Sequence, residues 1–78
     1  MPASKAQKEC LKALGEKVKA IRNEKGLTLK DLAFAIGKEP QSIHRLEVGG
    51  INPTYLYLLD ICIGLDIDIT ELLDNLAE

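Results

Sequence analysis

The chain is poor in the residues that stabilise small folds without a large apolar core. Its 78 residues include two cysteines, no tryptophan and only 4% aromatic residues. Two thiols do not make a disulfide framework, and residues 1–9 are polar and charged, unlike a signal peptide. We therefore expect reduced cysteines and a cytoplasmic protein. Leu, Ile, Val and Ala must fill the core, which favours packed helices over short strands.

Long apolar runs and catalytic patterns are also missing. The longest apolar run, residues 55–65, is interrupted by Asp60 and Gly64 and falls short of the ~18 residues of a membrane span. One histidine and two cysteines cannot supply four zinc ligands without carboxylates. The sequence contains no nucleophile–base pair and no glycine-rich phosphate loop. We expect no membrane partner, no metal, no cofactor and no enzymatic activity.

Positive charge is confined to the first part of the chain. All ten lysines and arginines lie between Lys5 and Arg45 with five of the acids, so this part carries +5. The remaining seven acids follow Leu46, so the second part carries −7 and the whole chain −2. A chain polarised in this way can present one surface to a polyanion and another to a different partner, although solvated charges can also cluster by chance.

Five helices are predicted from apolar spacing and from signals at the helix ends. A flexible lead-in over residues 1–8 precedes a single domain over residues 9–78. The first helix runs from Glu9 to Lys25, and Gly26 follows it. Asn52 is predicted to cap the fourth helix, with Pro53 at its first position. Asp68 is predicted to cap the fifth in a reciprocal capping box with Glu71.

The second and third helices are short and joined by a tight turn, which is typical of a helix-turn-helix. Thr28 begins the second helix, with Asp31 three residues on, and Gly37 ends it. Pro40 stands in the first turn of the third helix, which extends to about Val48. Its inward positions are Ile43 and Leu46, and its outward positions are polar: Gln41, Ser42, His44 and Arg45.

Several motifs occur together in a specific order: Gly26-Leu27-Thr28, Leu32-Ala33, Gly37, Ile43, Leu46-Glu47 with Gly49, Asn52-Pro53 and Ile69-Thr70-Glu71-Leu72-Leu73. In this order the segment from about Leu14 to Leu73 resembles the lambda repressor/Cro-like (XRE-type) helix-turn-helix family. The resemblance implies an all-α, compact five-helix bundle whose third helix enters the major groove of DNA. It also implies a cytoplasmic, nucleoid-associated transcriptional regulator, with repression as the expected mode.

The resemblance carries functional roles to individual positions. Gln41, Ser42 and Arg45 match the base-reading positions of the family, where arginine suits guanine and glutamine suits adenine. Positions matching phosphate contacts are Thr28, Lys30, Lys38 and His44. In similar proteins, the positions of Arg22 and Glu47 form a partly buried ion pair between the first and third helices.

This sequence departs from the family pattern at three places. Leu29 stands where a phosphate-contacting glutamine is usual, and Pro40 replaces a polar residue that often reads a base. The loop over residues 48–51 has no basic residue. These departures imply fewer phosphate contacts and an affinity that depends on a dimer or a partner.

A homodimer is expected, since a two-fold protein reads two half-sites about one helical turn apart. Its interface should use the apolar residues of the acidic second part that the core leaves free: Ile61, Leu65, Ile67, Ile69 and Leu76. Two other functions remain open. One is a protein-interaction module, such as an antitoxin that binds a basic toxin. The other is a dimeric scaffold that has lost DNA binding.

Overall fold

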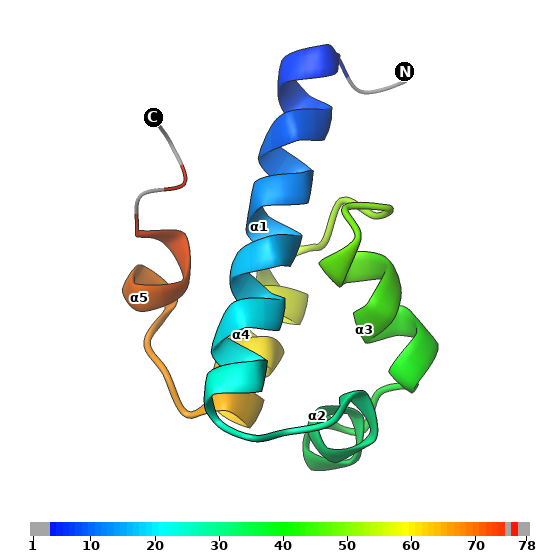
Figure 1. Ribbon diagram of the computed structural model, residues 1–78, viewed down its shortest axis with the longest axis vertical. Helices are drawn as coiled ribbons and strands as arrows, with labels where there is room; N and C mark the ends of the chain where they lie inside the picture. Colours follow the sequence, from blue (N-terminus) through cyan, green and yellow to red (C-terminus); the bar gives the residue numbers. More distant parts are fainter. Residues whose placement is uncertain (1–3, 75, 77–78) are drawn as a thin grey trace.

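The computed structural model describes residues 4–74 and 76, and within them the chain forms five helices and no strand. The helices are α1 (Lys5–Glu24), α2 (Leu29–Ile36), α3 (Pro40–Glu47), α4 (Tyr55–Leu65) and α5 (Ile69–Leu73). The long α1 has α3 on one side and α5 on the other, with α2 near its C-terminal end (Figure 1). The predicted all-α fold of five helices is confirmed.

The core contains aliphatic side chains from every helix. α1 packs against α3 and α5, α2 packs against α3 and α4, and α4 also contacts α5. The largest fully buried side chains are Val18, Leu32, Ile43, Leu46, Ile61, Leu65 and Leu72. Burial of aliphatic surface drives the assembly, as the scarcity of aromatic residues predicts.

α1 begins earlier than its apolar spacing predicts. The Ser4 hydroxyl accepts a hydrogen bond from the Gln7 amide (3.1 Å), and the Gln7 side chain accepts one from the Ser4 amide (2.8 Å). This capping box satisfies amides that the first turn would leave without partners. The predicted lead-in over residues 1–8 is therefore wrong for residues 5–8, which are helical, while residues 1–3 lie outside the described residues.

The predicted start and end of α2 match the structure. The Thr28 hydroxyl accepts from the Asp31 amide at 3.0 Å, and the Asp31 carboxylate accepts from the Thr28 amide at 2.9 Å. Gly37 ends the helix in the left-handed conformation, with φ of 67°, which an L side chain rarely adopts. Pro40 stands at the start of α3, where its missing N–H costs no helical hydrogen bond.

The predicted cap of α4 is wrong, and that of α5 is right in its position but not in its hydrogen bonds. Asn52 and Pro53 precede α4, and Thr54 caps it by accepting a hydrogen bond from the Tyr57 amide at 3.1 Å. Asp68 is the N-cap residue of α5, as predicted, but its side chain makes no capping bond. The Glu71 amide donates instead to the backbone carbonyl of Asp68, at 3.0 Å, so the reciprocal capping box does not form.

Two glycines allow helices to approach closely. A Cβ at Gly15 would overlap the carbonyl oxygens of Leu46 and Glu47 and lie 2.6 Å from the Glu47 carbonyl carbon. A Cβ at Gly64 would lie 2.5 Å from the Leu32 side chain of α2. Gly15 therefore sets the distance between α1 and the C-terminal end of α3.

Replacing Gly15 by alanine should destabilise the protein. The methyl group would press on α3 backbone, and such overpacking costs about 1–3 kcal/mol, which outweighs the ~1 kcal/mol helix preference of alanine. Thermal and denaturant unfolding measure the change, with Glu16→Ala as the control because Glu16 is the exposed neighbour. A Gly15→Ala protein as stable as the wild type would contradict the close approach of α1 and α3.

Candidate nucleic-acid interface

α3 has a buried side and an outward side. Ile43, Leu46 and Glu47 are buried, whereas Gln41 and Arg45 are exposed. Gln41 and Arg45 are four residues apart, so their side chains are neighbours on one face of the helix. The structure thus brings together two predicted base-reading residues on a helix whose opposite side is fixed in the core.

Ser42 and His44 lie on the two flanks of α3. The Ser42 hydroxyl is half-buried and lies 2.7 Å from the Tyr57 hydroxyl of α4, so the two groups form a hydrogen bond. His44 is exposed and lines a groove of about 250 Å³ between α1 and α3 with Lys12, Glu16 and Lys19. Of the three predicted base readers, only Ser42 is already bonded within the protein.

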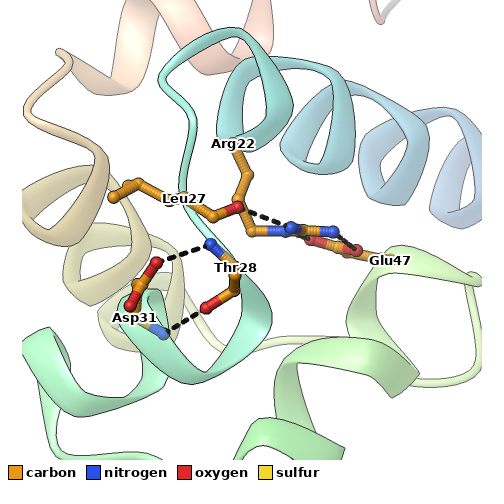
Figure 2. Close-up of polar contacts among 5 residues, drawn as sticks. All are labelled: Arg22, Leu27, Thr28, Asp31 and Glu47. Atoms are coloured by element: carbon orange, nitrogen blue, oxygen red, sulfur yellow. Dashed lines mark hydrogen bonds and ion pairs between the residues drawn. The ribbon is translucent and has the colours of Figure 1, made fainter.

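The C-terminal end of α3 is attached to α1 by the Arg22–Glu47 ion pair that the family resemblance implies. Arg22 Nε donates to Glu47 Oε2 at 2.7 Å, and Nη2 donates to Oε1 at 3.1 Å (Figure 2). The two side chains are only 9% and 2% exposed. The bidentate bond with Glu47 raises the pKa of Arg22, so the guanidinium stays charged inside the fold.

The same guanidinium also reaches the segment before α2. Arg22 Nη1 donates to the Leu27 carbonyl at 2.8 Å, next to the Thr28–Asp31 capping box (Figure 2). Backbone and side-chain hydrogen bonds from Thr28 hold the pKa of the Asp31 carboxyl below its ordinary value. Arg22 therefore joins the C-terminal end of α3 to the entry of α2.

The predicted phosphate contacts differ in their surroundings. Thr28 and Lys30 are exposed at the N-terminal end of α2. The Lys38 ammonium instead lies 5.2 Å from the centre of the Tyr57 ring and 3.5 Å from the Asp60 carboxylate. Lys38 is therefore engaged within the protein before any DNA binds.

Two residues near α3 were missed by the sequence analysis. Val48 caps the C-terminal end of α3, is exposed, and continues the outward face at the seventh position after Gln41. Its helical spacing could have revealed it. Tyr57 is fifteen residues from Ser42 in the chain, and no periodic pattern links the two.

The structure corrects the predicted dimer residues. Ile61 and Leu65 are fully buried in the core and cannot form an interface, so this part of the prediction is wrong. Ile67, Ile69 and Leu76 are partly buried against the core. The exposed large apolar residues of α4 are instead Leu56 and Ile63, at 71% and 73% exposure, together with Tyr55 at its start. α4 is apolar on both sides, so its sequence could not show which side faces inward.

Other chemistry has little support among the described residues. No group of three or more His, Cys, Asp or Glu side chains in this part of the chain could hold a metal ion. Burial raises the pKa of the Cys62 thiol, which keeps it protonated and unreactive. None of the described helices combines the length and apolar character needed to cross a membrane.

Comparison with known proteins shows the family of the chain. The helix-turn-helix family model HTH_3 matches residues 18–72, so the chain belongs to this family of XRE-type, DNA-binding transcription regulators. It is similar to the restriction-modification controller protein C.AhdI from Aeromonas hydrophila, with 31% identity and a TM-score of 0.77 over 80% of this chain and 94% of that chain.

A second solved structure, the clp gene regulator ClgR from C. glutamicum, is 29% identical. It superposes with a TM-score of 0.82 over 87% of this chain and 88% of that chain. No curated protein sequence matches the chain significantly. The family match and both structures agree with the predicted family.

Glu47→Ala should destabilise the fold strongly, because it strands the buried Arg22 charge. Removing one partner of a buried pair costs about 3–5 kcal/mol. Denaturant unfolding measures the loss. Glu39→Ala is the control, since Glu39 is an exposed glutamate at the opposite, N-terminal end of α3 and makes no side-chain capping bond. Equal midpoints for Glu47→Ala and Glu39→Ala would show that the pair contributes nothing.

Proposed function

We propose that the protein is a sequence-specific regulator that binds double-stranded DNA as a homodimer, with α3 in the major groove. The observation that carries this proposal is the outward face of α3. Its two exposed polar side chains, Gln41 and Arg45, stand on a helix whose other side is buried. Arginine matches the two acceptors of guanine, and glutamine matches the acceptor and donor of adenine.

Phosphate contacts would come from residues around this face. Thr28 and Lys30 lie at the start of α2, and His44 lies on the flank of α3 toward α1. A charge of +5 over the first 45 residues supports binding of a polyanion by this part of the chain. Lys38 would reach phosphate only by leaving Asp60, so we expect it to contribute less.

A second copy of the chain is the partner we propose for the exposed side of α4. Leu56 and Ile63 are exposed there, and Asp60 between them is the only charged residue of α4. Ile67, Ile69 and Leu76 could extend this contact. A two-fold dimer would present two copies of α3 to two half-sites.

Repression is the mode we propose, since a bound dimer can block a promoter by occupying it. A protein-interaction module is the second candidate function. It is favoured by the −7 charge that follows Leu46, which would attract a basic partner such as a toxin.

Arg45→Ala should lower affinity for a site selected from random DNA by about fivefold to 150-fold, because a bidentate base contact supplies about 1–3 kcal/mol. Affinity for random DNA should fall only slightly. Gel shifts over a salt series measure both, and wild-type binding should weaken linearly in a log–log plot. Lys8→Ala removes the same charge near the N-terminal end of α1 and should affect both DNAs equally. If Arg45→Ala lowered affinity for the selected site and for random DNA equally, Arg45 would contact the DNA backbone and not a base.

Ile63→Glu should convert the dimer to a folded monomer, since it places a charge in the proposed apolar contact. Sedimentation equilibrium at high micromolar concentration measures the mass, and circular dichroism checks the fold. Ala20→Glu, on an exposed position of α1, is the control and should leave the dimer intact. A monomeric wild type, or a dimeric Ile63→Glu protein, would contradict this interface.

A further inference from the structure

Tyr57 contacts both the turn that joins α2 to α3 and the first turn of α3. Its hydroxyl bonds to the Ser42 hydroxyl at 2.7 Å, in the first turn of α3. The ammonium of Lys38, in the turn after α2, lies 5.2 Å from the centre of the Tyr57 ring. One side chain from α4 therefore contacts residues on both sides of Pro40.

The contacts of Tyr57 connect α4 to the region of α3, although these two helices pack little against each other. α3 packs against α1 and α2, and its contacts with α4 are few. The C-terminal end of α3 is attached to α1 through Glu47. At its N-terminal end, the Ser42–Tyr57 bond links α3 itself to α4, and the part-exposed Lys38–Asp60 pair links the preceding turn to α4.

Tyr57 is itself held in place from two directions. Its backbone amide donates to the Thr54 hydroxyl at 3.1 Å, which fixes the first turn of α4. The Lys38 ammonium above its ring also lies 3.5 Å from Asp60, one turn further along α4. A cation above an aromatic ring is attracted to it, so Lys38 limits the positions that the ring can adopt.

We propose that Tyr57 is a positioning residue for DNA recognition, which fixes the N-terminal end of α3 through Ser42. This inference rests on the proposed DNA binding. Gln41 directly precedes Ser42, so a shift of Ser42 changes where Gln41 points. Discrimination between bases requires contact groups held to within about 0.5 Å, which a loosely attached helix end cannot provide. Ser42 then acts through the protein rather than by reading a base.

The test compares Tyr57→Phe, Ser42→Ala and the double variant, using the ratio of affinities for a selected site and for random DNA. Each single variant should lower this ratio by about threefold to tenfold, the usual effect of one hydrogen bond. The double variant should lower it no further, because both changes remove the same bond. Loss of folded protein lowers both affinities equally and leaves the ratio unchanged.

Tyr55→Phe is the matched control, because it removes a hydroxyl from the exposed tyrosine two residues earlier and should leave the ratio at the wild-type value. Three results would overturn the proposal. They are a wild-type ratio for Tyr57→Phe, a lower ratio for Ser42→Ala without a lower ratio for Tyr57→Phe, and losses that multiply in the double variant. The second would make Ser42 a base reader. If Tyr57→Phe fails to fold, Ser42→Ala with Tyr57 intact tests the same bond, and a wild-type ratio then overturns the proposal.

Failure of the proposed function gives a different result. A wild-type protein that binds selected and random DNA equally, or neither, would contradict sequence-specific binding, and the role of Tyr57 would fall with it. A selective wild type with an unaffected Tyr57→Phe would contradict the positioning role alone.

Discussion

The buried ion pair between Arg22 and Glu47 is the interaction on which the arrangement of the helix-turn-helix depends. It joins α1 to the C-terminal end of α3, and the third bond of Arg22, to the Leu27 carbonyl, extends the link to the entry of α2. The pair can form because Gly15 has no side chain and lets α1 approach the last carbonyl groups of α3. A buried pair of this kind adds little net stability but fixes geometry, because neither charge can leave without stranding the other.

Different residues therefore hold the two ends of α3. Glu47 holds one end, and the turn from Gly37 to Pro40 together with the Ser42–Tyr57 bond holds the other. The inward face of α3 is buried and Ser42 on one flank is bonded to Tyr57, while Gln41, Arg45 and the flanking His44 are exposed. Charge is also divided along the chain. Every lysine and arginine precedes Leu46, and the charged residues of α4 and α5 are acidic. α3 is thus a helix fixed at both ends that exposes Gln41 and Arg45 on its outward face.

The sequence predicted features that depend on neighbouring residues better than features that depend on packing. The Thr28–Asp31 box and the left-handed Gly37 follow from local chemistry, and both are present. Asn52 and Thr54 are both good capping residues, and only the packing of α4 decides between them. The inward side of α4 could not be predicted, because Ile61 and Ile63 are equally apolar although one is buried and the other exposed. Base-reading roles came from family resemblance and stay predictions.

Binding to a selected site in which single guanines are replaced by 7-deazaguanine tests whether Arg45 contacts guanine in the major groove. The modified base keeps its Watson–Crick pair but lacks the N7 acceptor in the major groove. We expect one such replacement in each half-site to weaken binding by the wild type and to leave binding by Arg45→Ala unchanged, because the lost acceptor is the partner of Arg45. Wild-type binding that tolerates every replacement would contradict the placement of α3 in the major groove with Arg45 on guanine.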